Sequence, residues 1–149
     1  MEKHILFVCT GNTCRSPMAA GLFNAAAARA GLPARASSCG ISVFAPSPAT
    51  PAAVRAAAGC GADISAHQAQ PATEALLSAA DRVYCMTHGH LDVLELMFPA
   101  RAGRLAMLGA SDIPDPFGGT DEEYAAVCRQ IRQAVEKLAR QMGKEQEPR

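Results

Sequence analysis

The first thirty residues place a cysteine-bearing loop between a buried strand and a helix. Residues 4–8 are short, apolar and followed by a turn signal, which predicts a buried strand. Ser16 and Pro17 predict a helix start, because Ser suits the N-cap and Pro suits the first helical position. The helix is expected over 18–30, with Gly31 as its C-cap. A strand that turns directly into a helix is the repeating unit of α/β folds, so this feature constrains the whole chain.

The rest of the chain continues this alternation. Strands are expected at 35–39, 82–86 and 105–108, and helices at 52–58, at 71–80, between Thr87 and Pro99, and after Thr120. Alternating elements with right-handed crossovers predict a parallel sheet covered by helices on both faces. Ligands of such sheets bind beyond the carboxyl ends of the strands, where the loop after residue 8 lies if the first strand is central.

The last helix carries the clearest pattern. Thr120 and Glu123 form a Thr-x-x-Glu capping box. Gly143 predicts the end of this helix, and 144–149 is expected to be a frayed polar tail. Six apolar residues recur at steps of three and four and predict one buried face: Tyr124, Val127, Ile131, Val135, Leu138 and Met142.

Residues 9–16 combine a thiol, a turn and a guanidinium in a Cys-x5-Arg-Ser spacing. Backbone N–H groups in such a loop, above a helix N-terminus, bind a tetrahedral oxyanion and lower the pKa of a sulfur beside it. Arg15 adds two parallel donors for phosphate oxygens, while Gly11 and Asn12 suit left-handed backbone angles. The expected phosphate-binding residues are Thr10, Gly11, Asn12, Thr13, Cys14, Arg15 and Ser16.

Cys9 is the expected nucleophile of this loop. Its attack on phosphorus would give a thiophosphoryl enzyme, which water then hydrolyses, and the Ser16 hydroxyl would ease departure of the sulfur. The alternative is a structural cysteine in an ordinary turn, which would leave Arg15 without a partner.

Asp115 is the expected proton donor, and it stands between two prolines shortly before the last helix. A carboxylic acid partly removed from water can protonate a leaving group near neutral pH. An aspartate beside proline is frequent in turns, so Asp115 alone would be weak evidence for a catalytic acid. The prediction depends on the presence of the cysteine loop in the same chain.

Residues 9–19 together with 115–117 resemble the low-molecular-weight protein tyrosine phosphatase family. The resemblance covers nearly the whole chain. It implies a three-layer flavodoxin-like α/β fold, with a four-stranded parallel sheet flanked by helices, in a single domain over 1–149. It also implies two-step catalysis by Cys9, Arg15 and Asp115 without a metal or a cofactor.

Three features resemble the bacterial protein-arginine phosphatase branch of that family: Thr13, the Met86-Thr87 pair with His90, and the glycines after Phe117. An aromatic phosphoester would leave the Thr13 hydroxyl unpaired at a cost of ~1–3 kcal/mol, whereas a guanidinium can bond to it. Phosphoarginine is therefore the expected substrate and phosphotyrosine the alternative. Phe117 can stack on either group and does not discriminate between them.

Charge and cysteine usage argue against several other classes. Lys plus Arg and Asp plus Glu number 14 each, so no partnership with nucleic acid or a membrane is expected. Six scattered cysteines without an export signal predict free thiols and a cytoplasmic protein. No Cys-x2-Cys pair suggests zinc, and His88 and His90 would lie on different helix faces, so no metal site is expected. We expect a monomer that acts on phosphorylated proteins.

Two other functions stay open. Arsenate reductases share this fold and cysteine loop, but they need further cysteines close together, whereas Cys85 and Cys128 are far apart in the sequence. A phosphoprotein-binding module needs neither a thiol nor an acid. Within the phosphatase reading, Cys14 could trap oxidised Cys9 as a disulfide, which predicts reversible redox control.

Overall fold

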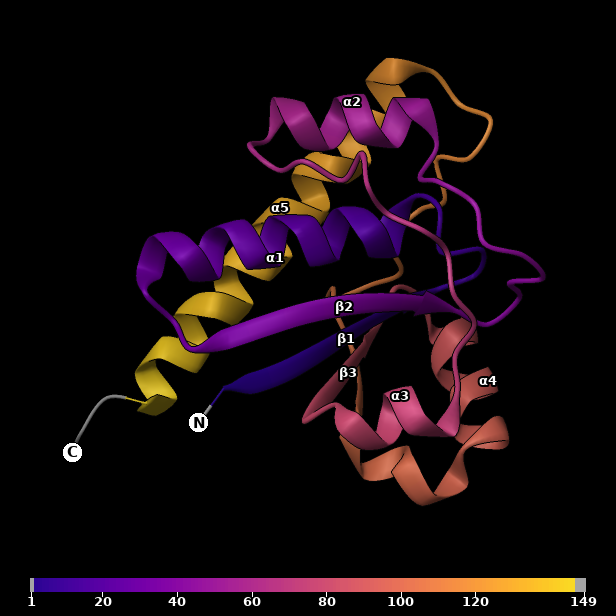
Figure 1. Cartoon of the computed structure of the whole chain (residues 1–149), viewed down its shortest axis with the longest axis vertical. Coiled ribbons are helices and arrows are strands. Elements are labelled where there is room, and N and C mark those ends of the chain that lie inside the picture. The colour runs from indigo at the N-terminus through magenta and orange to yellow at the C-terminus, as the bar shows by residue number, and fades with distance from the viewer. Residues whose placement is uncertain (1, 147–149) are drawn as a thin grey trace.

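A four-stranded, all-parallel sheet forms the centre of the computed structural model, which describes residues 2–146 (Figure 1). The strands are β1 (Lys3–Cys9), β2 (Ala34–Gly40), β3 (Arg82–Cys85) and β4 (Leu105–Met107). They lie in the order β2-β1-β3-β4, and every neighbouring pair is parallel. The predicted parallel sheet is confirmed.

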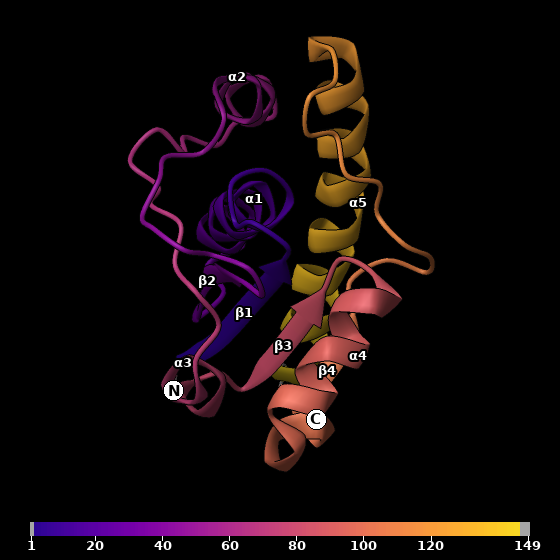
Figure 2. The ribbon, with the colours of Figure 1, turned by 90° about the vertical axis from the view of Figure 1, so that its right-hand side faces the viewer.

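Helices cover both faces of this sheet (Figure 1 and Figure 2). α1 (Arg15–Ala30), α2 (Pro51–Gly59) and α5 (Asp121–Gln146) lie on one side, α3 (Glu74–Ala79) and α4 (His88–Met97) lie on the other, and a 3₁₀ helix (Pro99–Arg104) precedes β4. Side chains of β1 alternate between these layers, as a strand requires. Ile5 and Phe7 join the core under α1 and α5, and Leu6 and Val8 join the core under α3 and α4. The fold is the three-layer α/β class that the sequence predicted.

The first helix begins two residues earlier than predicted. Its N-cap is Cys14, which makes no side-chain capping bond, and Arg15 is the first helical residue. The prediction of Ser16 as N-cap is wrong, because its hydroxyl is bonded inside the cysteine loop instead. Gly31 ends the helix with a left-handed φ of 63°, as predicted.

The last helix runs past its predicted end. The capping box is formed, with Thr120 Oγ1 accepting from Glu123 N at 3.1 Å, and all six residues of the predicted stripe are buried. The helix nevertheless continues through Gly143 to Gln146. Burial of Met142 and an Arg82–Glu145 ion pair of 3.0 Å hold the final turn, which explains why one glycine does not end it. The rest of the predicted tail, 147–149, lies outside the described residues.

The carboxyl end of β1 lies at the point where the strand order reverses, between β2 and β3. The loop that leaves it passes close to the end of β2, where a Cβ on Gly40 would lie 2.6 Å from the Thr10 carbonyl oxygen. Glycine is therefore required there for the two segments to approach. Among the helices of residues 2–146, none has the length and apolar character needed to span a bilayer.

Candidate active site

A pocket of ≈ 290 Å³ opens beyond the carboxyl end of β1. It joins two distant parts of the sequence, the loop after β1 and the loop that leads to α5. Its lining consists of Cys9, Thr10, Gly11, Thr13, Cys14, Arg15, Asp115 and Phe117. All of these are residues that the sequence singled out, so the structure brings the expected nucleophile, cation and acid into one pocket, while their roles stay predictions.

The Cys9 thiol lies inside the loop with its residue only 2% exposed. Ser16 Oγ lies 2.8 Å from the sulfur and accepts a hydrogen bond from Asn12 Nδ2 at 2.7 Å. The hydroxyl proton then has two acceptors within reach, the sulfur at 2.8 Å and the Cys39 carbonyl oxygen at the longer distance of 3.5 Å. The backbone N–H groups of Ser16 and Asn12 donate to the sulfur as well.

Burial raises the pKa of the Cys9 thiol above its ordinary value, although Ser16, Arg15 and Asn12 all act to lower it. The sequence-based expectation of a lowered pKa is therefore wrong in direction, because removal of water from the sulfur outweighs the donors around it. Those donors offset part of this cost, because they interact more strongly with a negatively charged sulfur than with the thiol. They stabilise negative charge on sulfur both when it attacks and when it leaves.

The loop turns its carbonyl groups away from the pocket. Since the N–H and C=O groups of one trans peptide unit point in opposite directions, the N–H groups that follow these carbonyls face the other way. An oxyanion in the pocket therefore meets backbone donors rather than carbonyl oxygens. The engaged carbonyls are those of Cys9, Thr10, Asn12 and Thr13, which accept from Ile41 N at 3.0 Å, Ser42 N at 3.0 Å, His67 Nε2 at 2.7 Å and Thr50 N at 3.0 Å.

Asn12 is the buried centre of the loop. It takes the left-handed φ of 57° that the sequence suggested, whereas Gly11 does not take a positive φ, so that part of the prediction is wrong. Its Nδ2 donates to Ser38 Oγ at 3.0 Å as well as to Ser16, and its Oδ1 accepts from Gln70 N at 2.9 Å. Sequence analysis missed Ser38 and Gln70. The available signal was the Ser37-Ser38 pair within β2, because the side chains of two successive strand residues point to opposite faces and a covered polar group needs a partner.

Arg15 and Asp115 face each other across the pocket. The Arg15 side chain is 5% exposed, and its Nη2 lies 3.5 Å from Asp115 Oδ2. Its Nη1 donates to the Ile113 carbonyl oxygen at 3.1 Å. A buried guanidinium needs such partners, and here both of them come from the acid loop.

The acid loop holds Asp115 at the rim. Asp115 Oδ1 accepts from Phe117 N at 3.0 Å, and Gly118 turns the chain with a φ of 80°. The carboxylate is half exposed, and the Phe117 side chain is 70% exposed beside it. The loop thus offers an acid that both water and a leaving group can reach, next to a free aromatic face.

Two residues of the pocket wall differ in their bonding. The Thr13 hydroxyl has a single polar neighbour among residues 2–146, the Cys14 sulfur at 3.8 Å. Cys14 is buried, and its sulfur lies 3.4 Å from the Tyr124 hydroxyl and 3.7 Å from Thr50 Oγ1. Thr13 therefore presents an unused donor and acceptor to whatever enters the pocket.

His90 supports the pocket from α4. Its Nε2 lies 2.8 Å from Thr10 Oγ1, and its buried Nδ1 has no hydrogen-bond partner in the part of the chain described. Burial and the charge of Arg15 lower the pKa of His90 to about 4, so it is neutral at physiological pH. His88 points elsewhere and bonds to Asp112 at 2.8 Å, as expected for two histidines on different helix faces. No cluster of three or more metal-ligating side chains occurs among residues 2–146.

A family model described as "Low molecular weight phosphotyrosine protein phosphatase" matches residues 4–148. The chain is 38% identical over 147 residues to the protein-arginine-phosphatase of Bacillus subtilis (strain 168), covering 95% of each. It is 29% identical over 150 residues to the low molecular weight protein-tyrosine-phosphatase Wzb of Escherichia coli (strain K12), covering 98% of this chain and 99% of Wzb.

Solved structures show the same likeness. A mutant of the YwlE arginine phosphatase with a phosphorylated active site serine superposes with a TM-score of 0.91 at 35% sequence identity. The alignment covers 96% of this chain and 97% of that one.

Proposed function

Because the chain belongs to the low molecular weight phosphotyrosine protein phosphatase family, we propose that it hydrolyses phosphoarginine in proteins through a phosphorylated Cys9. Its relatives include arginine and tyrosine phosphatases, so family membership alone does not identify the substrate. We therefore infer the substrate from the residues that line the pocket. The observation that carries the choice is the Thr13 hydroxyl, which bonds to no nitrogen or oxygen among residues 2–146.

A polar substrate suits this wall better than an aromatic one. The guanidino nitrogens of phosphoarginine can bond to the Thr13 hydroxyl, whereas a tyrosine ring would bury it without a partner. An unpaired buried hydroxyl costs ~1–3 kcal/mol, which corresponds to a preference of ~5-fold to 150-fold. The unprotonated oxygen of the Asp115 carboxylic acid can accept a further bond from the guanidino group, while the exposed Phe117 ring can stack on either kind of substrate.

In the first step the Cys9 thiolate attacks phosphorus, and the phosphorus–nitrogen bond breaks. Asp115 gives its proton to the departing nitrogen, which keeps the electron pair of the broken bond. The Arg15 guanidinium and the loop N–H groups hold the phosphoryl oxygens as negative charge shifts among them.

In the second step water attacks the phosphorus of the thiophosphoryl enzyme. The Asp115 carboxylate takes a proton from that water, and the sulfur–phosphorus bond breaks to release phosphate. The Ser16 hydroxyl, 2.8 Å from the sulfur, donates to the thiolate that leaves.

The cysteines support this reading over a reductase. Cys39 and Cys85 are buried, and burial together with the nearby Cys9 and Cys85 raises the pKa of Cys39. Burial raises the pKa of Cys85 to about 12, which makes it a poor thiolate for passing on a disulfide. All six cysteines are free, which supports the reducing cytoplasm as the site of action.

The test compares kcat/KM on matched phosphoarginine and phosphotyrosine peptides under reducing conditions. We expect the parent protein to prefer phosphoarginine. Thr13→Val removes only the hydroxyl at nearly constant shape, and Thr13→Ile makes the wall apolar, so both should shift the preference toward phosphotyrosine by ~5-fold or more. A parent that prefers phosphotyrosine would refute the substrate assignment. Cys9→Ser should abolish turnover on both peptides while phosphate still binds.

A further inference from the structure

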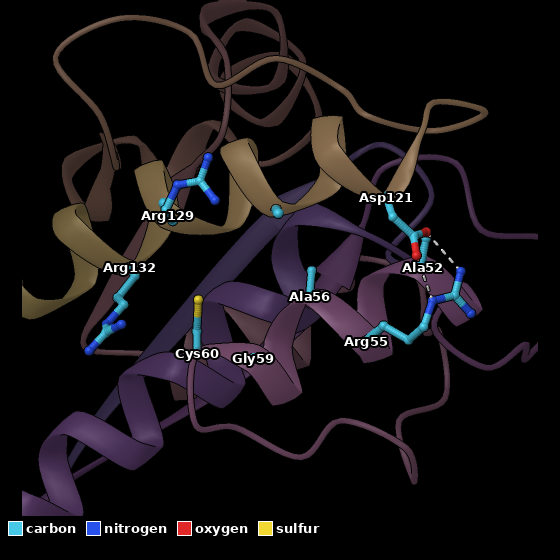
Figure 3. Close-up of a pocket in the computed structure, with 9 residues that line it drawn as sticks. Ala52, Arg55, Ala56, Gly59, Cys60, Asp121, Arg129 and Arg132 are labelled. Carbon is cyan, nitrogen blue, oxygen red and sulfur yellow. Dashed lines mark hydrogen bonds and ion pairs between the residues drawn. The ribbon is translucent and has the colours of Figure 1, made fainter.

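A second groove, of ≈ 400 Å³, lies between α2 and α5 (Figure 3). Its floor is made of small side chains at helical spacing, with Ala52, Ala56 and Gly59 on α2 and Ala125 on α5. Because these residues are small, a ligand can approach the backbones of both helices. Nothing in the two catalytic steps uses this groove.

Three arginines border this floor, Arg55 from α2 and Arg129 and Arg132 from α5 (Figure 3). Arg55 is held by Asp121 through hydrogen bonds of 3.0 and 2.9 Å, and Arg132 Nε lies 3.2 Å from a carboxylate oxygen of Glu136. Arg129 makes no ion pair within residues 2–146. The groove is therefore positively charged on a chain whose formal net charge is zero.

Hydrogen bonds connect the first turns of α2 and α5, which carry the groove, to the cysteine loop of the catalytic pocket. Thr50, the N-cap of α2, donates its backbone N–H to the Thr13 carbonyl oxygen at 3.0 Å. Its hydroxyl lies 3.3 Å from the Tyr124 hydroxyl in the first turn of α5. Tyr124 in turn lies 3.4 Å from Cys14 of the cysteine loop. Because Ala52 and Asp121 of the groove are within three residues of Thr50 and Tyr124, the groove lies next to the catalytic pocket.

We propose that the groove is an exosite for acidic residues that lie close in sequence to the phosphorylated residue of a protein substrate. This rests on the proposed function, because only a protein substrate must carry its own chain across the rim of the pocket. Carboxylates complement the arginines, and Arg129 provides the main contact since no carboxylate of this chain occupies it. The floor of alanine and glycine accepts an extended backbone. Nucleic acid would need a longer basic surface than three arginines provide.

The experiment uses two phosphoarginine peptides that differ only in three flanking residues, Glu in one and Gln in the other. The groove variant is the double substitution Arg129→Gln and Arg132→Gln. The matched control is Arg140→Gln, an exposed arginine of the same helix that lies outside the groove. A small aryl phosphate, which cannot reach the groove, reports the catalytic pocket alone.

We expect the parent and Arg140→Gln to prefer the acidic peptide by ~3-fold to 10-fold in kcat/KM, mainly through KM, and less so at high salt. The double variant should lose that preference and keep its aryl phosphate activity. The exosite proposal would be overturned if the parent had equal kcat/KM values on the two peptides, or if the double variant kept the preference for the acidic peptide.

A binding measurement tests the groove even if the proposed phosphatase activity is wrong. If the parent hydrolyses no phosphopeptide, binding of the unphosphorylated acidic peptide is measured by titration. Binding that the double variant weakens and Arg140→Gln does not would support the groove as an acidic-peptide site. Binding equal in all three proteins would overturn it.

Discussion

Arg15 Nη2 lies 3.5 Å from Asp115 Oδ2, so the cation expected to bind phosphate also holds the expected acid in place. Arg15 Nη1 adds a bond of 3.1 Å to the Ile113 carbonyl oxygen, two residues before Asp115. A buried guanidinium at the start of α1 thus fixes the loop that leads to α5. Because one group serves both functions, the position of the acid depends on the same side chain that orients the phosphate.

Asp115→Asn should separate the two functions of that loop. The amide keeps its place beside Arg15 but has no acidic proton to give, so turnover of a phosphoarginine peptide should fall by ~10²- to 10⁴-fold. An aryl phosphate with an acidic phenol leaves without protonation, so its first step should be nearly unchanged. Burst kinetics on both substrates give this comparison. An equal loss on both would contradict the assignment of Asp115 as proton donor.

Ser16→Ala should slow release of the sulfur more than its attack. Loss of one hydrogen bond to a charged group costs ~1.5–3 kcal/mol, or ~10-fold to 150-fold in rate. With an aryl phosphate, the variant should show a burst of phenol followed by slow steady turnover. The phosphoenzyme should accumulate on Cys9, and mass spectrometry of the quenched protein measures it. Ser38→Ala, which also loses a bond to Asn12 but does not touch the sulfur, is the control. A burst of equal size in the control would contradict a direct role for Ser16.

The sequence was sufficient to predict the elements that depend on neighbouring residues. The stripe from Tyr124 to Met142 is buried as its spacing predicted, and the parallel sheet follows from the order of the elements. The end of α5 was missed because the Arg82–Glu145 ion pair joins residues 63 positions apart, which no local rule for Gly143 can reveal.

In the site too, features set by neighbouring residues were predicted and features set by long-range contacts were not. The Cys-x5-Arg-Ser spacing places the thiol and the guanidinium from local geometry alone, and the structure brings Asp115 to them. His90 was noticed in a resemblance and in the rejected metal pair with His88, but its bond to Thr10 was not predicted, since the two residues are 80 positions apart. The pKa of Cys9 was predicted in the wrong direction for a related reason. The spacing shows the donors around the sulfur, but its burial depends on packing from the whole fold.

Cys14→Ala should make oxidation of the enzyme irreversible. Peroxide oxidises the Cys9 thiolate to a sulfenic acid, and attack by the Cys14 sulfur then forms a disulfide and releases water. Activity of the parent after peroxide treatment should therefore return with a thiol reductant, and activity of Cys14→Ala should not. Cys39→Ala is the control, since Cys39 is also near Cys9 but burial raises its pKa. If Cys39→Ala, and not Cys14→Ala, prevents recovery, then Cys39 is the resolving cysteine.

His90→Gln should flatten the loss of stability on mild acidification. His90 binds a proton near pH 6.5 in the unfolded chain but only at about pH 4 in the fold, because burial and Arg15 disfavour its charge. Between these values the unfolded state binds more protons, so the free energy of unfolding falls as pH falls from about 6.5 toward 4. At 1.36 kcal/mol per pKa unit, His90 accounts for about 3 kcal/mol of that loss at most. Gln can keep a bond to Thr10 but does not titrate.

The measurement is the free energy of unfolding from denaturant titrations at several pH values between 4 and 7.5. The folded-state pKa values of Asp63, Asp112 and Asp121 are lowered, so these carboxylates lose their contributions mainly below pH 4, outside the window. Titrations that do not involve His90 cancel in the difference, and Asp112, whose lowered pKa depends in small part on His90, titrates mainly below this window. That difference should therefore be constant above pH 6.5 and change steadily in favour of the variant below it. Parallel curves for the two proteins would show that His90 titrates alike in both states, in spite of its burial.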